Sequence, residues 1–197
     1  MATSVVQIVN NGLARISQEA ITSLNEDTEQ ARISNLIYEQ VRDDVITDHV
    51  WNFAVKRIEL ARDSEGPAFG YAYSYTLPTD CLKVLGMEQQ TMVYEIESGK
   101  LLTDEGTAKI KYIRRVIDPN EFSSKFIEAL SARLAAELAI PLVDSSTLQQ
   151  NMYELYLRKL MDAKSVDSQE SGANEIVADT WVSSRLNYAG SLILENN

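Results

Sequence analysis

The sequence contains very few of the residues that usually form covalent links and catalytic centres. Among 197 residues there is one cysteine, Cys81, and one histidine, His49. A single cysteine excludes a disulfide within the chain and fits folding in a reducing compartment. Lone thiols usually pack as small hydrophobic side chains, so we expect Cys81 to be structural rather than nucleophilic.

Common catalytic and cofactor motifs are missing as well. His49 would have to serve any Ser–His–Asp triad, yet no nucleophile elbow is present. We therefore interpret it as a histidine at a helix C-terminus that interacts with the last carbonyls. One His, one Cys and scattered carboxylates show no metal-ligand spacing, and segment 66–70 lacks the lysine and helix of a phosphate loop. We expect no cofactor.

No apolar run approaches the roughly 20 residues that a membrane-spanning helix needs, so we expect no membrane insertion. The N-terminus lacks the basic-then-apolar pattern of a signal peptide. A chain of this length with 45% hydrophobic residues predicts a soluble globular protein of one domain, with room for a sub-domain.

Acidic residues outnumber basic ones by 29 to 18, and the formal net charge is −11. Such a balance argues against tight binding to a nucleic-acid backbone, and is compatible with a protein that DNA passes without sticking. Simple solubility explains the charge equally well. The one local basic cluster is predicted on a strand, where it could touch DNA, touch an acidic neighbouring subunit or remain solvated; it comprises Lys109, Lys111, Arg114 and Arg115.

Helical periodicity is clearest between residues 118 and 168, where two helices fold back on each other. Asp118 and Pro119 suit the start of the first helix, and Pro141 is predicted to end it. A row of alanines on this helix indicates close packing on a second side. The second helix is predicted to start at Asp144 or Ser145. The alanine row is Ala129, Ala132, Ala135, Ala136 and Ala139.

Two further helices are predicted near the N-terminus, with caps at Ser4 and Asp27 and ends near Ile16 and His49. Residues 51–62 fit either a helix or an extended segment, and we favour the extended form. Large side chains at alternate positions from Phe69 to Leu77 then predict a strand. Further strands are expected at 83–87, 92–97, 100–103 and 108–116, the middle two joined as a hairpin across Ser98–Gly99.

The C-terminal part differs from the rest of the chain in composition. Residues 165–174 are polar and without pattern, which is typical of a linker. Isolated large side chains follow, and we interpret residues 176–194 as an arm that docks on another chain, with packing on its own subunit as the alternative. The candidate anchors are Trp181, Leu186, Tyr188, Leu192, Ile193 and Leu194.

Paired carboxylates are the remaining candidates for catalysis, because two of them suffice for glycoside hydrolysis. Glu95 and Glu97 share a strand face, and Asp104 and Glu105 follow nearby. An acidic chain supplies such pairs by chance, so we predict no catalytic residues. The residues alone thus indicate an acidic α+β protein with a docking arm, without defining its function.

The predicted fold is an antiparallel-type helical bundle with a small, mostly antiparallel sheet inserted between its helix pairs and an extended C-terminal arm. The N-terminal helices occupy residues 1–50, and the β-rich insertion occupies 51–117. The C-terminal hairpin at 118–168 completes the bundle, and residues 169–197 form the arm.

A series of short patterns resembles one known family, the tail tubular protein A family of head-to-tail adaptors in short-tailed bacteriophages. The match spans roughly residues 5 to 163, and its most specific pieces are WNFA at 51–54 and LPTDCL at 77–82. The patterns in chain order are Val9–Asn10, 49–54 (HVWNFA), Arg57 and Leu60, 77–84 (LPTDCLKV), 112–116 (YIRRV), Phe122 and Phe126, and 129–139 (ALSARLAAELA).

The resemblance implies a structural virion protein made in the host bacterial cytoplasm. Twelve copies would form a ring between the portal protein and the tail nozzle, a protein of the tail tubular protein B type, and would extend the DNA ejection channel. The bundle would form the ring wall, the sheet would meet the nozzle, and the arm would grip the portal. That last role would suit Trp181, Arg185 and Tyr188. The alternatives are a tail-associated cell-wall or polysaccharide hydrolase and a non-viral helical binding module.

Overall fold

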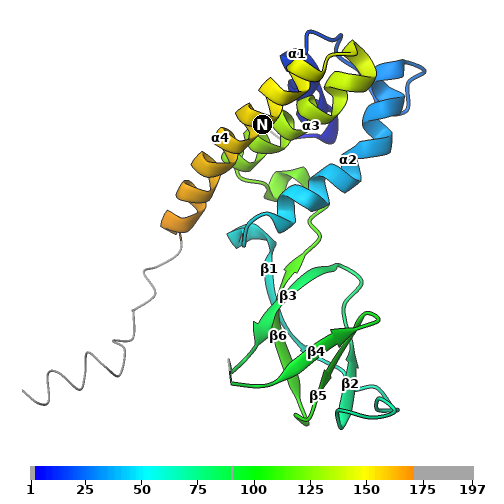
Figure 1. Ribbon diagram of the computed structural model, residues 1–197, viewed down its shortest axis with the longest axis vertical. Helices are drawn as coiled ribbons and strands as arrows, with labels where there is room; N and C mark the ends of the chain where they lie inside the picture. Colours follow the sequence, from blue (N-terminus) through cyan, green and yellow to red (C-terminus); the bar gives the residue numbers. More distant parts are fainter. Residues whose placement is uncertain (1–2, 90, 171–197) are drawn as a thin grey trace, which may run out of the picture.

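The computed structural model describes residues 3–89 and 91–170, which form a mixed α+β structure. Figure 1 shows the helices gathered at one end of the molecule and the strands at the other. The helices are α1 (Val5–Arg15), α2 (Glu29–Thr47), α3 (Ser124–Val143) and α4 (Ser146–Glu170). The strands are β1 (Val55–Leu60), β2 (Tyr73–Thr76), β3 (Cys81–Met87), β4 (Tyr94–Glu97), β5 (Lys100–Thr103) and β6 (Ala108–Arg114).

The two N-terminal helices begin at side-chain caps. Ser4 caps α1 as predicted, because its hydroxyl accepts a hydrogen bond from the Gln7 N–H. The prediction of Asp27 as the α2 cap is wrong. Thr28 holds that position in an extended conformation, and its hydroxyl accepts from the Ala31 N–H at 3.3 Å.

Helix α3 starts later and ends later than the sequence suggests. Asp118 and Pro119 open a short 3-10 helix, Pro119–Glu121, and Ser123 caps α3 itself. Pro141 lies inside the helix instead of ending it. A proline this close to the end removes only its own N–H from the hydrogen-bond ladder, so the last turn can persist beyond it. The helix stops at Asp144, whose backbone is left-handed (φ 52°).

Helix α3 packs against the other three helices, α1, α2 and α4. All five alanines of the predicted row are buried, which confirms that the helix is covered on more than one side. The closest approach is at Gly12 of α1, where an added Cβ would lie 3.1 Å from the Ser131 carbonyl oxygen and 3.3 Å from the Leu134 Cβ. The absence of a side chain at Gly12 therefore sets the spacing of α1 and α3.

Helix α4 continues to Glu170, so the prediction of a linker from residue 165 is wrong over its first part. Asp167 in the last turns is 6% exposed. Its carboxylate accepts a hydrogen bond from the Asn52 N–H at 3.0 Å. A buried polar group with a partner stabilises the helix end without any apolar repeat, which is why the sequence pattern did not show it.

The strands form two antiparallel sheets, in the orders β1–β6–β3 and β2–β5–β4, rather than the single sheet expected. The β4–β5 hairpin across Ser98 and Gly99 is confirmed, and both residues have positive φ. Strands β5 and β6 follow each other in the chain but belong to different sheets. The large buried side chains between the sheets make a second core, separate from that of the helices; it contains Leu60, Tyr75, Met87, Leu101, Ile110 and Tyr112.

The alternating aromatic segment is shorter as a strand than predicted. Only Tyr73–Thr76 is in β2, with Tyr75 buried against the second core. Phe69 is 88% exposed on the preceding loop, where Gly70 has φ of 91°. A left-handed glycine ends the alternation of side chains between the two faces, so the row does not continue upstream.

Trp51 is fully buried where the helices meet the strands. Its indole N–H donates to the Val45 carbonyl oxygen at 3.0 Å, and its ring lies edge-on to Phe126 at a centroid distance of 5.1 Å. After it, Asn52–Ala54 forms one 3-10 turn and β1 begins at Val55. The extended form favoured for this region is therefore confirmed from Val55 onward.

Asp63 fastens the loop before β2 to the second sheet. Its carboxylate accepts from the Lys100 ammonium at 2.8 Å, from Thr76 at 2.9 Å and from Ser74 at 3.0 Å. The Lys100 hydrogen bond, followed by that of Thr76, lowers the pKa of Asp63 to about 2. The ionised form of this carboxylate thus stabilises the folded state.

Gly12→Val should destabilise the protein, because its methyl groups would press on the α3 backbone. We expect the free energy of unfolding to fall by about 1–3 kcal/mol more than for Ala14→Val. Ala14 is exposed on the same helix, so that control isolates the cost of a β-branched residue. Urea denaturation measures the difference, and equal losses would contradict the close approach of α1 to α3.

Asp63→Asn should lower the unfolding temperature at neutral pH and matter progressively less in acid. The folded pKa is about 2 and the ordinary value is 3.8, so the unfolded state takes up a proton first as the pH falls. The stabilisation is complete above about pH 4 and lost by about pH 2. Thermal unfolding of both proteins across this range tests it; a constant difference would refute the assignment to the charged carboxylate.

Candidate interaction surfaces

The predicted basic cluster separates into two pairs of residues with different surroundings. Lys109 and Lys111 project from one face of β6, whereas Arg114 and Arg115 lie at its end, beside the helices. The Arg114 guanidinium pairs with Glu121 and donates to the Phe53 carbonyl oxygen at 3.3 Å. The Arg114 side chain is thus engaged within the fold.

Arg115 links the strands to α2. Its Nε donates to the Asp43 carboxylate at 2.7 Å, and the same carboxylate pairs with the Arg42 guanidinium at 2.8 Å. Arg42 is 3% exposed, so its charge needs this partner. The two arginines of the cluster therefore hold the strands against the helices.

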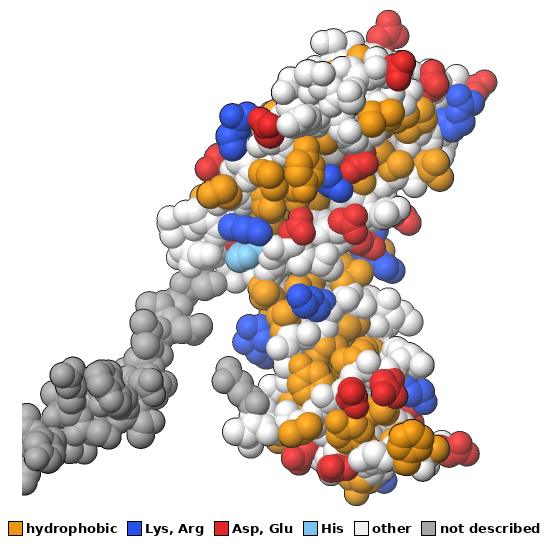
Figure 2. Space-filling model, viewed as in Figure 1, with side chains coloured by type: hydrophobic (Ala, Val, Ile, Leu, Met, Phe, Trp, Pro, Cys, Tyr) orange, Lys and Arg blue, Asp and Glu red, His pale blue; other side chains and the backbone are white. Residues whose placement is uncertain are grey.

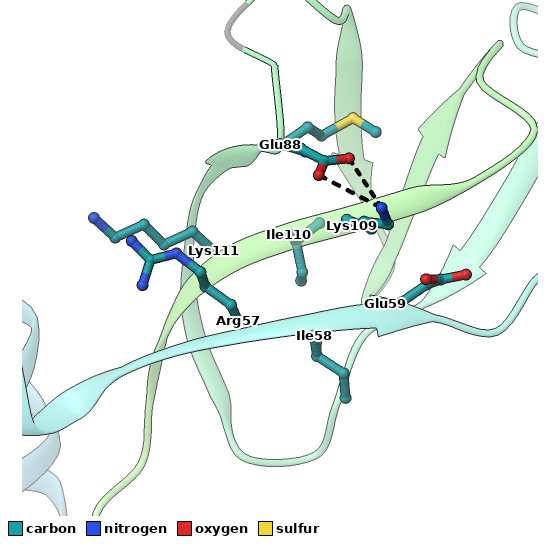
Figure 3. Close-up of a pocket in the computed structure, with 8 residues that line it drawn as sticks. Arg57, Ile58, Glu59, Glu88, Lys109, Ile110 and Lys111 are labelled. Carbon is teal, nitrogen blue, oxygen red and sulfur yellow. Dashed lines mark hydrogen bonds and ion pairs between the residues drawn. The ribbon is translucent and has the colours of Figure 1, made fainter.

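The two lysines line an open groove on the first sheet, with a volume of about 560 Å³. Lys109 pairs with Glu88 across the groove at 3.2 Å. Lys111 lies directly opposite Arg57 of β1 in the strand register. Figure 3 shows the Arg57 and Lys111 side chains extending together toward one end of the groove, while the Lys109–Glu88 pair lies farther along the sheet.

Neither Arg57 nor Lys111 forms an ion pair with any residue in the described ranges 3–89 and 91–170. Like charges directly opposite on neighbouring strands are destabilising. Sequence reasoning singled out Lys111 but missed Arg57, since only the β1–β6 register brings the two together. Their juxtaposition is the strongest electrostatic sign of a ligand on the first sheet.

The candidate carboxylates are on the other sheet. Glu95 and Glu97 are exposed on β4, an edge strand, and neither forms an ion pair with a described residue. Burial and the nearby Glu95 carboxylate raise the pKa of the Tyr71 hydroxyl. Asp104 accepts a hydrogen bond from the Ala72 N–H at 2.8 Å. This edge offers negative charge to a partner.

The sequence suggested that His49 interacts with the last carbonyls of α2, but the structure gives it other partners. Its Nε2 lies 3.2 Å from the Asp167 carboxylate of α4, and its ring packs edge-on against Trp51 at 4.9 Å. Asp48 beside it accepts a hydrogen bond from the Tyr156 hydroxyl of α4. These contacts join α4 to the end of α2, so the histidine has a structural environment.

Cys81 is partly buried at the edge of the second core, and burial raises the pKa of its thiol. A raised pKa keeps the thiol protonated and weakly nucleophilic near neutral pH. The interpretation of Cys81 as a packed side chain is confirmed.

Helix α4 carries exposed apolar side chains beside its packed face. Tyr153, Leu157 and Met161 are 42%, 43% and 71% exposed, and their spacing of four residues places them in one line. Figure 2 shows hydrophobic side chains gathered on the surface of the helical part. We call these three residues the α4 stripe. Sequence periodicity missed it because the buried face of α4 dominates the pattern.

The predicted arm anchors and Arg185 lie outside the described residues. Within the described ranges, no group of three or more His, Cys, Asp or Glu side chains is placed to hold a metal ion. No helix in the described part of the chain is long and apolar enough to cross a membrane. Comparison with protein-family models gives no match, and comparison with curated proteins gives no significant match either.

Lys111→Glu and Arg115→Gln should change stability in opposite directions. The first replaces a repulsive cross-strand pair with an attractive one and should raise the free energy of unfolding by about 0.2–1 kcal/mol. The second removes the partly exposed Asp43 pair and should lower it by up to about 1 kcal/mol. Urea denaturation at low salt measures both. If Lys111→Glu destabilised the protein, Lys111 would have a structural role that its surroundings do not show.

Proposed function

We propose that the protein is a structural component of a phage virion, a head-to-tail adaptor of the tail tubular protein A type. Copies of the chain would form a ring between the portal and the tail nozzle and extend the channel for DNA ejection. The observation that carries the proposal is the α4 stripe, a line of large apolar side chains on the surface of the helical part. The sequence resemblance supplies the identity of the assembly.

The α4 stripe supports assembly because exposed, contiguous apolar side chains mark surfaces that meet another molecule. A subunit in a ring presents two different patches, each of which binds its counterpart on the next copy. The stripe would be one such patch, and a neighbouring copy would cover it. The Arg133 guanidinium lies 5.2 Å from the Tyr153 ring centroid, which holds one end of the stripe in place.

The proposed role divides the chain along its length. The helices would form a bundle that builds the ring wall, with twelve copies as the resemblance implies. The strands would point toward the nozzle, and the arm with Trp181, Arg185, Leu186, Tyr188, Leu192 and Ile193 would bind the portal. The net charge of −11 would keep passing DNA from adhering. The role is mechanical and involves no catalysis.

Electron microscopy of the protein with portal rings of the phage that encodes it tests this function. We expect a twelvefold ring seated on the portal. Leu157→Glu with Met161→Glu should abolish the ring and leave the monomer folded, because both side chains are exposed in the subunit. The control is Asn151→Glu with Arg158→Glu, at exposed positions of α4 away from the stripe, which makes the chain more negative than the stripe variant does.

Other results of these experiments would contradict the proposed function or part of it. A protein that ignores the portal and stays monomeric would refute the adaptor proposal. Rings formed equally well by the stripe variant would show that the contact between copies lies elsewhere. Hydrolysis of cell-wall or capsular polysaccharide that is lost in Glu95→Gln would instead favour a tail-associated hydrolase.

A further inference from the structure

Arg57 and Lys111 form a cationic site that has no ion-pair partner among residues 3–89 and 91–170. They face each other across β1 and β6 at one end of the groove on the first sheet. Nearby cations are paired: Lys109 with Glu88 at 3.2 Å and Lys56 with Asp80 at 3.6 Å. A bound anion between the two side chains would turn the repulsion into two attractive contacts.

The surroundings favour a carboxylate over a nucleic-acid backbone. Glu59 lies opposite Lys109 in the strand register, and Glu88 is on the adjoining strand end, so negative charge borders the cationic pair. Binding to DNA depends on many cations that neutralise successive phosphates. Two cations flanked by carboxylates suit one or two acidic side chains of a protein partner.

The chain itself carries a surface of matching charge. Glu95 and Glu97 are exposed on β4, an edge strand of the second sheet, without an ion pair among the described residues. Val93 and Ile96, beside them, are 70% and 43% exposed. An edge strand with exposed acidic and apolar side chains is suited to contact another subunit.

We propose that Arg57 and Lys111 of one copy bind the Glu95 and Glu97 carboxylates of the next copy. This contact rests on the proposed ring and names part of its subunit interface. The Arg57–Lys111 pair is on the first sheet and the Glu95–Glu97 pair is on the second. Each copy therefore contacts one neighbour through its basic pair and the other neighbour through its acidic pair. Such a head-to-tail contact builds rings rather than closed pairs. Because the contact is electrostatic and at the surface, high salt weakens it.

Charge reversal in two complementary variants tests the contact. The first variant is Arg57→Glu with Lys111→Glu, and the second is Glu95→Lys with Glu97→Lys. Each alone places like charges together and should assemble at least about tenfold more weakly, a loss of about 1.4 kcal/mol. An equimolar mixture should restore assembly, since every contact then joins opposite charges.

Assembly is measured by sedimentation and by electron microscopy on portal rings, at low and high salt. The control for the first variant is Arg32→Glu with Lys83→Glu, which changes the net charge by the same amount at exposed positions that have no ion pair with a described residue. The control should assemble like the wild type. Unfolding temperatures of all variants establish that each is folded.

The outcomes separate this contact from the adaptor function. Wild-type rings with unaffected reversal variants would overturn the contact and leave the adaptor function standing. Loss of assembly in both variants, without recovery in their mixture, would show that the two charged pairs do not meet. That result would also overturn the contact. A first variant that forms normal rings but loses retention on duplex DNA or on the nozzle would assign the cations to that partner. A wild-type protein that never assembles would overturn both proposals.

Discussion

The burial of Trp51 is the contact on which the rest of the structure depends. It is fully buried between the end of α2 and the start of β1, and its ring packs against Phe53 and Phe126. Large aromatic side chains contribute more buried area than any others, so one such residue can organise a junction. Ile113 of β6 and Val116 belong to the same helical core, and Leu82 and Leu85 of β3 pack against it, so the strands join the helices through apolar contacts as well.

Polar contacts around this tryptophan fix the direction in which the strands leave the helices. Asp167 of α4 binds both the Asn52 N–H and His49, and Arg115, just after β6, binds Asp43 of α2. Each of these contacts joins two segments that are far apart in the sequence. Because Asp167 is buried, the geometry of its contacts is held more tightly than that of exposed ion pairs. A rigid junction would suit the proposed adaptor, which would have to transmit position between two partners.

The charged side chains farther from Trp51 differ in whether they stabilise the single subunit. Arg114 and Arg115 stabilise the subunit, whereas Arg57 and Lys111 repel each other across two strands and have no ion pair with a residue that the structure describes. The α4 stripe likewise leaves apolar area in water. Features that lower the stability of a single copy are expected where a protein binds others, since binding supplies the missing contacts. Both features therefore support assembly of the chain with other molecules.

Several local elements of this protein could be predicted from short stretches of sequence. Ser4 caps a helix, Ser98–Gly99 turns a hairpin and the alanine row is buried, because each depends on residues close together in the chain. Tertiary structure alone decided the split into two sheets, the extension of α4 to Glu170 and the meeting of Arg57 with Lys111. These depend on pairing between distant segments, where register and buried hydrogen bonds override local pattern. The resemblance to a phage adaptor needed only short sequence patterns, while the surfaces that could build its ring emerged from the fold.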